Sequence, residues 1–253
     1  MSDAYILSAV RTPIGKRKGA FAFTRPDDLM GDCLNGLVNR VAVDPAQVED
    51  VIVGCVTQIG EQGLNVGRTS VLAAGWPVSV PGTSVNRMCA SGLQSVNFAA
   101  QAVMAGAMDL VVGGGVESMT RVQMGGDAGP VSERILDRFD VVNQGISAEL
   151  IAERYGFSRL ELDALAVESH RRALSAIDEG RFRKEILSVE VRGPNGESLT
   201  ITTDEGPRRG STAEALAALK PAFKEGGVIT AASSSQISDG AAAVLLGSKA
   251  KAA

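Results

Sequence analysis

The spacing of apolar residues in the first half of the chain constrains its fold more than any other feature of the sequence. Segments of strand length occupy residues 4–10, 51–56, 83–88 and 110–112. Between them, apolar side chains recur at intervals of three and four residues in 29–41, 64–74 and 90–107, as on one face of a helix. Strands that alternate with helices are typical of βαβ units, so the sequence predicts an α/β fold with a parallel sheet.

A more polar stretch interrupts this alternation after about residue 117. Helical patterns occur within it at 147–155, 158–179 and 212–219. Ser158 and Glu161 have the Ser-x-x-Glu spacing of a capping box, which predicts a helix start. The tripeptide Pro-Asn-Gly at 194–196 predicts the turn of a hairpin that spans 186–203.

Small and apolar residues return near residue 226, and residues 241–246 have the composition of a buried strand. We therefore expect two domains. A core α/β domain would comprise residues 1–118 and 226–253. An inserted α+β domain would comprise residues 119–225.

The composition excludes several classes of protein. The 253 residues carry 25 Lys and Arg against 29 Asp and Glu, with no basic run, which argues against a nucleic-acid or anionic-membrane partner. No apolar run approaches the roughly 20 residues that span a bilayer, and the N-terminus has no apolar segment like that of a signal peptide. The three widely spaced cysteines form neither a disulfide framework nor a zinc knuckle, which favours a reducing, cytoplasmic location.

Cys89 is the strongest candidate for a catalytic residue. It lies in the segment NRMCASGLQS, where an expected strand meets an expected helix. A thiol at a helix N-terminus lies near unpaired N–H groups and the positive end of the helix dipole, which favour a thiolate and can hold a developing oxyanion. The competing interpretation is a buried structural cysteine. It fits Cys33, on the apolar face of 29–41, and Cys55, within a strand pattern.

The segment NRMCASGLQS resembles the nucleophile segment of the thiolase family. The segments RTPIGKRKGAF near the start, GGGVESMTR at 113–121, LKPAF at 219–223 and SDGAAAVLL at 238–246 resemble further thiolase segments in the family's order. The resemblance covers essentially the whole chain. It implies a βαβαβαββ N-terminal domain that carries an inserted, coenzyme A-binding loop domain, in keeping with the interruption at 119–225.

The resemblance implies roles for Cys89, Arg208 and Ser235. Cys89 would take the acyl group on its side chain and contribute its backbone N–H to an oxyanion hole. Arg208, in DEGPRRG, would lie near the nucleotide end of coenzyme A, since a guanidinium suits phosphate or stacks on adenine. Ser235, in ASSSQISDG, would lie near the pantetheine. Coenzyme A thioesters would be the substrates, and we expect no bound cofactor and no metal.

Parts of the chain depart from the family pattern. Ala-Ser at 232–233 replaces the usual Gly-Asn, so we expect a different shape for the loop that carries Ser235. Asn-Gln-Gly at 143–145 stands where biosynthetic thiolases often have His-Met-Gly, which weakens the case for acetoacetyl-CoA as the preferred substrate. The segment 117–143 is short in a region that often builds a tetramer contact, so both a homodimer and a higher homo-oligomer are compatible with the sequence.

The sequence contains only part of the chemical machinery of a thiolase. His170 is its only histidine and lies at the edge of a helical apolar stripe, where we expect a solvated or half-buried side chain rather than a general base. The Gly-His-Pro and Cys-x-Gly-Gly-Gly segments that hold the base and second cysteine of thiolases are absent. We therefore expect a fragment, or one subunit of a split enzyme whose partner chain holds those segments, and no activity from the chain alone.

Three functions can be compared with these features. The first is a thiolase-type acyltransferase that carries out reversible Claisen condensation and thiolysis of 3-ketoacyl-CoA through acyl-Cys89. The second is a non-catalytic half that supplies a coenzyme A pocket or an assembly surface. The third is a condensing enzyme of the ketoacyl-synthase type, which the residues around Cys89 and the inserted segments disfavour. The glycines at 113–115 match neither a dinucleotide-binding nor a P-loop spacing.

Overall fold

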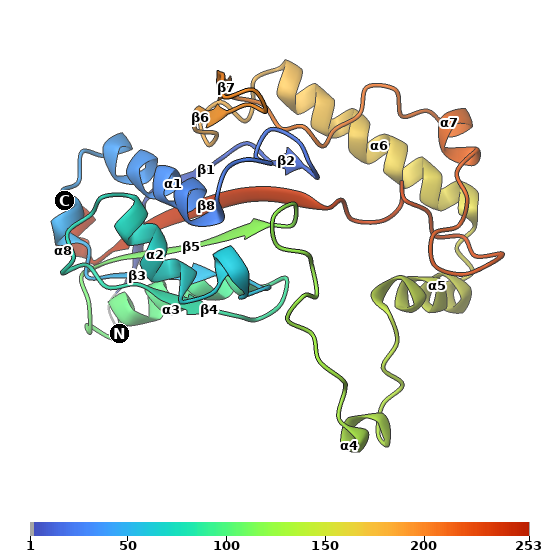
Figure 1. The fold of residues 1–253 in the computed structure, drawn as a ribbon, viewed down its shortest axis with the longest axis horizontal. Coiled ribbons are helices and arrows are strands. Elements are labelled where there is room, and N and C mark those ends of the chain that lie inside the picture. The colour runs from blue at the N-terminus through green and yellow to red at the C-terminus, as the bar shows by residue number, and fades with distance from the viewer. Residues whose placement is uncertain (1–2, 253) are drawn as a thin grey trace. The chain divides into compact units, whose positions relative to one another are not determined.

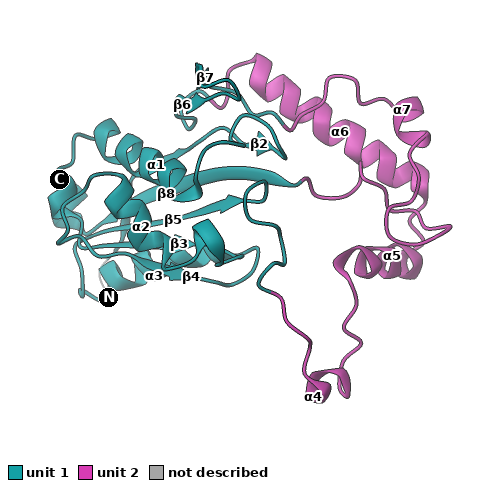
Figure 2. Cartoon of the chain, in the orientation of Figure 1, with its two compact units in different colours: residues 1–127, 183–205, 237–253 teal, residues 128–182, 206–236 magenta. Residues whose placement is uncertain are grey.

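The computed structural model describes residues 3–252, which divide into two compact units (Figure 1; Figure 2). Unit 1 takes the residues up to 127, residues 183–205 and the residues from 237 onward. Unit 2 takes residues 128–182 and 206–236. Among the described residues, no helix is both long and apolar enough to cross a membrane.

A mixed sheet forms the centre of unit 1. Its strands are β1 (Tyr5–Arg11), β2 (Gly15–Lys16), β3 (Asp50–Gly54), β4 (Thr83–Val85), β5 (Leu110–Ser118) and β8 (Ser238–Gly247). The strand order is β1-β8-β5-β3-β4, and β2 pairs with β8. The α/β fold class expected from the alternation is therefore confirmed.

The expected parallel pairing holds for part of the sheet only. Strand β3 runs parallel to β4 and β5, but β8 runs antiparallel to β5 and to β1. Helical crossovers that fold back onto the sheet enforce the parallel direction, and they separate β3, β4 and β5. Strand β8 instead follows the long excursion through unit 2, so no such crossover fixes its direction.

The side chains of β3 alternate between two faces of this sheet, and each face packs against different helices. Val51 and Val53 belong to the larger core cluster, whereas Ile52 belongs to a second cluster with Ala99 and Val103. This period of two is the one expected of a strand covered on both sides. Helices α1 (Pro26–Arg40) and α2 (Val66–Ala73) contribute to the first cluster, and α3 (Ser91–Met104) contributes to the second.

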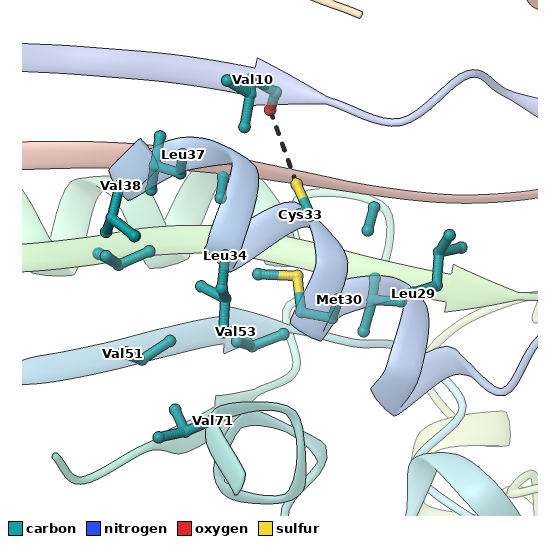
Figure 3. Packing of buried hydrophobic residues seen from close by; sticks show 14 of the residues in the cluster. Val10, Leu29, Met30, Cys33, Leu34, Leu37, Val38, Val51, Val53 and Val71 are labelled. Carbon is teal, nitrogen blue, oxygen red and sulfur yellow. Dashed lines mark hydrogen bonds between the residues drawn. The ribbon is translucent and has the colours of Figure 1, made fainter. Parts of the chain in front are cut away.

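Helix α1 confirms the apolar stripe expected from its spacing. Its first turn contains Pro26, whose missing N–H needs no partner there. The stripe is buried in the larger core cluster, and Figure 3 shows Cys33 directed at Val10 of β1. Its members are Leu29, Met30, Cys33, Leu34, Leu37 and Val38. Val41 was expected on the same stripe but is exposed, because the helix ends at Arg40 and Val41 is its C-cap.

Helix α3 approaches the sheet more closely than its apolar pattern suggests. Its buried residues recur every four positions and are mostly small: Ser91, Ser95, Ala99 and Val103. A Cβ added to Gly113 of β5 would lie 2.6 Å from Val96 Cα, so the helix backbone occupies the space of a side chain. The expected stripe included Leu93, which is instead 66% exposed, because the helix turns its small residues toward the glycine-rich strands.

The hairpin expected around residues 194–196 is present and belongs to unit 1. It consists of β6 (Val189–Arg192) and β7 (Ser198–Ile201), with Gly196 at φ +83° in the turn. Val189 and Val191 enter the larger core cluster, and Leu187 N donates a hydrogen bond of 2.8 Å to Arg11 O. This packing is why residues 183–205 group with unit 1, although they lie inside the range 119–225 expected for an inserted domain.

Unit 2 is mainly helical. Its helices are α4 (Glu133–Leu136), α5 (Gln144–Tyr155), α6 (Arg159–Asp178) and α7 (Ala213–Ala217). Ser158 and Glu161 form the expected capping box at the start of α6. The side chain of Glu149 is buried and accepts hydrogen bonds of 2.9 Å from Val228 N and Ile229 N. The short helix α8 (Lys249–Ala252) belongs to unit 1.

Candidate functional site

The turn between β4 and α3 carries Cys89 and contains an unusual backbone conformation. Cys89 is exposed, and the residue before it, Met88, has φ +50°. Left-handed backbone is costly for residues other than glycine, asparagine and aspartate, and it persists only where the surroundings enforce it. Met88 is one of five described non-glycine residues with positive φ, and it is the one that adjoins an exposed cysteine, so this turn is a candidate functional site.

Hydrogen bonds from nearby side chains hold both ends of Met88. Its N–H donates to Asn86 Oδ1 at 2.8 Å. Its carbonyl accepts from Ser91 Oγ at 2.6 Å and from Ser91 N at 3.0 Å. Ser91 Oγ also accepts from Arg87 N at 2.9 Å. The chain is thereby turned sharply from the strand into the helix, and Cys89 lies at the outside of the turn.

The first turn of α3 receives no capping side chain. Its N-cap is Ala90, which has no side-chain acceptor. Helices α1 and α4 also lack an accepting N-cap side chain. Helices α2, α5, α6 and α7 are each capped by one, from Asn65, Asn143, Ser158 and Thr212 respectively. The N–H groups at the start of a helix attract negative charge. The start of α3 thus presents donors beside Cys89 to a thiolate or to a developing oxyanion.

The other two cysteines lie in the core of unit 1. Burial, with a smaller contribution from the charge of Asp32, raises the pKa of Cys33 to about 12. Burial and then the charge of Glu117 raise the pKa of Cys55 to about 12. Both thiols therefore stay protonated at neutral pH, and of the three cysteines only Cys89 is both exposed and placed at a helix start.

Arg208 and Ser235 belong to unit 2, and both are exposed. Arg208 N donates a hydrogen bond of 3.3 Å to His170 Nδ1 on α6. Ser235 follows a turn in which Ser233 Oγ accepts from Thr230 N at 3.0 Å. The exposed side chains of Arg208 and Ser235 can both contact a ligand that binds to unit 2. Cys89 belongs to unit 1.

His170 is half-buried on α6, as expected for a histidine at the edge of an apolar stripe. Its Nδ1 accepts the hydrogen bond from the backbone of Arg208, so it helps to hold the loop that carries this arginine. Within residues 3–252, no group of His, Cys, Asp and Glu side chains is arranged to hold a metal ion.

Sequence reasoning gave no role to Asn86 or Glu117 and took Ser91 only as a small residue that lets a substrate approach the backbone, although all three occur in the segments quoted above. The carboxylate of Glu117 accepts hydrogen bonds from Val56 N at 2.8 Å and Gln62 Nε2 at 2.7 Å. Val56 O in turn accepts from Asn86 Nδ2 at 2.8 Å. In the sequence, only the short spacing of polar residues around Cys89 pointed to Asn86 and Ser91. The contacts among Asn86, Val56 and Glu117 could not be predicted, because they join segments that are far apart in the sequence.

Comparisons with known proteins agree on one family. The family model for the thiolase N-terminal domain matches residues 4–250. A steroid 3-ketoacyl-CoA thiolase from Mycobacterium tuberculosis is 44% identical over 98% of this chain and 63% of its own length. A 3-ketoacyl-CoA thiolase from Bacillus subtilis is 42% identical over 100% of this chain and 67% of its own length.

A solved structure shows the same fold. The crystal structure of the Bacillus anthracis acetyl-CoA acetyltransferase matches 100% of this chain and 67% of that chain, with a TM-score of 0.89 and 35% identity. The chain thus spans about two thirds of the length of the relatives it matches.

Proposed function

The chain belongs to the thiolase family, within its N-terminal domain, and on this premise we propose that it supplies the nucleophile for reversible thiolysis and Claisen condensation of 3-ketoacyl-CoA. The single observation that supports this most strongly is the position of Cys89. It is the exposed cysteine, it follows a strained left-handed residue, and it lies beside a helix start without a capping side chain.

In thiolysis, the Cys89 thiolate attacks the ketone carbon, C3, of 3-ketoacyl-CoA. The bond between C2 and C3 breaks, its electron pair stays on C2, and C2 takes up a proton to release acetyl-CoA. The acyl group remains on Cys89 Sγ as a thioester. The thiol of free coenzyme A then attacks this thioester, loses its proton to a base, and leaves as acyl-CoA while the thiolate is restored.

The start of α3 would stabilise the negative charge that develops on the carbonyl oxygen. The backbone N–H of Cys89 is the first donor that we assign to this oxyanion hole, following the family's pattern. Preorganised donors are effective because they need no rearrangement when the charge forms. The absence of a capping side chain at Ala90 is consistent with this role, since such an acceptor would occupy the same donors.

Coenzyme A would bind through unit 2. We assign Arg208 to the nucleotide end, because an exposed guanidinium can pair with phosphate or stack on adenine. We assign Ser235 to the pantetheine. The backbone hydrogen bond from Arg208 to His170 supports the first assignment, because it fixes the loop from which the guanidinium extends.

Turnover needs a base and a proton donor besides Cys89. His170, the only histidine in the sequence, is already an acceptor for the Arg208 backbone in unit 2. We therefore expect these 253 residues alone not to turn over 3-ketoacyl-CoA, and the base to come from a segment like those of the longer relatives or from a partner chain. A homo-oligomer and a cytoplasmic setting, which would keep Cys89 reduced, remain predictions.

The acyl-enzyme is the intermediate to test. The native protein would be mixed with an acyl-CoA, quenched in acid and digested, and the acyl adduct would be located by mass spectrometry. We expect a single adduct, on Cys89. Cys55→Ala provides the matched control and should keep the adduct. An adduct on Cys33 or Cys55 with none on Cys89 would contradict the proposal.

A further inference from the structure

We propose that Asn86 is a positioning residue that holds Met88 in its left-handed conformation and thereby sets the place of the Cys89 thiol. Ser91 would act with it on the other side of Met88. This inference rests on the proposed function of Cys89. It concerns two side chains that bind the Met88 backbone, from which the chain continues to the thiol.

Met88 keeps a left-handed backbone without help from its side chain. Met88 has φ +50°, and its side chain is exposed, so side-chain packing does not explain the conformation. An L-residue avoids this region because Cβ approaches the following carbonyl oxygen. Contacts of the backbone must therefore hold it.

Two side chains bind the polar groups of the Met88 backbone. The N–H of Met88 donates to Asn86 Oδ1 at 2.8 Å, and its carbonyl accepts from Ser91 Oγ at 2.6 Å. Both of its polar groups are thus bound by side chains within five residues of the chain. Ser91 is 3% exposed and fixed in the first turn of α3, so it is a rigid anchor.

Asn86 is itself held by a hydrogen bond to the backbone of Val56. Its Nδ2 donates to Val56 O at 2.8 Å, and Val56 N donates to the carboxylate of Glu117 at 2.8 Å. Glu117 lies on β5 in the middle of the sheet. A continuous path of hydrogen bonds therefore joins the central sheet to the residue before Cys89. If Asn86 is removed, Met88 loses one of the side chains that hold it, and the path ends at Val56.

Displacement of a reacting group by about 1 Å can lower a rate about 10²-fold. In the complete enzyme, with the base supplied by a further segment or a partner chain, Asn86→Ala is thus expected to lower kcat for thiolysis about 10²-fold. KM should change little, because the coenzyme A contacts are assigned to unit 2. Met88→Gly in the same background should restore about tenfold, since glycine adopts the left-handed conformation without a Cβ penalty.

Asn35→Ala is the matched control. Asn35 also donates its amide to a backbone carbonyl, Ala74 O at 3.1 Å, and accepts at Oδ1, from Trp76 Nε1 at 2.8 Å, but it lies on α1. It should lower thermal stability and leave kcat unchanged. If Asn86→Ala does not fold, Asn86→Asp replaces it, because it keeps an acceptor for Met88 N but loses the donor to Val56 O.

A crystal structure of the Asn86 variant supplies a readout that does not depend on thiolysis. We expect the backbone at Met88 to relax to negative φ and the thiol to move. Retention of φ near +50°, or a kcat equal to that of Asn35→Ala, or no recovery with Met88→Gly, would overturn the positioning role. Full activity in Cys89→Ala would instead overturn the proposed function, and the structure of the Asn86 variant would still decide the inference.

Discussion

The starts of α3 and α6 differ in how their first N–H groups are satisfied. Helix α6 begins with a complete capping box, in which Ser158 and Glu161 each accept from the backbone of the other. Helix α3 begins at Ala90 with no side-chain acceptor, behind a left-handed residue and beside an exposed cysteine. A closed start contributes stability, whereas an open start leaves donors for a ligand. The comparison therefore separates a start built for stability from a start available for chemistry.

Removal of the thiol at the open start should have the largest effect. Cys89→Ala is expected to lower acyl transfer by on the order of 10⁴-fold or more, since no other group can take the acyl chain. The complete enzyme, with its base supplied by a further segment or a partner chain, and its Cys89→Ala variant would be compared by steady-state thiolysis of a 3-ketoacyl-CoA. Retention of more than a few per cent of the activity would remove Cys89 from the mechanism.

Closing the open start should come next. Ala90→Asp places a carboxylate beside the N–H groups that we assign to the oxyanion, and it should lower kcat about 10²-fold, similar to the loss of one oxyanion donor. Ala90→Asn supplies a neutral control at the same position and should have a smaller effect. Thermal unfolding of both variants would show whether the fold is kept, and equal kcat for Ala90→Asp and native protein would contradict an oxyanion role for this helix start.

Removal of the guanidinium in unit 2 should affect binding rather than chemistry. Arg208→Ala is expected to raise KM for coenzyme A by the equivalent of about 1–3 kcal/mol, the range for a hydrogen bond to a charged group, with little change in kcat. Arg209→Ala is the neighbouring control, because that side chain pairs with Asp178 on α6. Equal KM values for Arg208→Ala and native protein would exclude the assigned contact.

Removal of the N-cap side chain of α6 should lower stability and leave activity unchanged. Ser158→Ala removes the side chain that accepts from Glu161 N and is expected to lower the free energy of unfolding by about 1 kcal/mol. Urea unfolding would measure this change, and kcat should be unaffected. A loss of activity without a loss of stability would show that α6 contributes more than a scaffold.

The smallest effect should appear in acid. Hydrogen bonds from the backbone and then the hydroxyl of Ser158 hold the pKa of Glu161 below its ordinary value of 4.5. Because the folded-state pKa is lowered, the stabilisation is present above the ordinary value and is lost as the pH falls through the folded-state pKa. The difference in Tm between native protein and Glu161→Gln should therefore shrink as the pH is lowered below 4.5, and a constant difference would exclude a charged cap.

The contrast also shows where sequence reasoning succeeded. Ser158 and Glu161 were identified from spacing alone, because a capping box is satisfied within one turn of chain. The junction of a strand and a helix around Cys89 was predicted because a strand pattern meets a helix pattern there, and the structure has β4 before it and α3 after it. The left-handed backbone of Met88 was not foreseen, since it depends on hydrogen bonds from its own N–H to Asn86 and to its own carbonyl from Ser91, and on the anchor of Asn86 at Val56.

The sequence by itself determined the local elements: the α1 stripe around Leu34, the turn at Gly196, the capping box of α6 and the strand-to-helix junction at Cys89. Each follows from side-chain spacing over a few neighbouring residues. Only the tertiary structure decided the antiparallel direction of β8 and the close approach of α3 to Gly113. These features depend on where distant segments meet, and that is settled by packing across the sheet rather than by the order of residues along any one element.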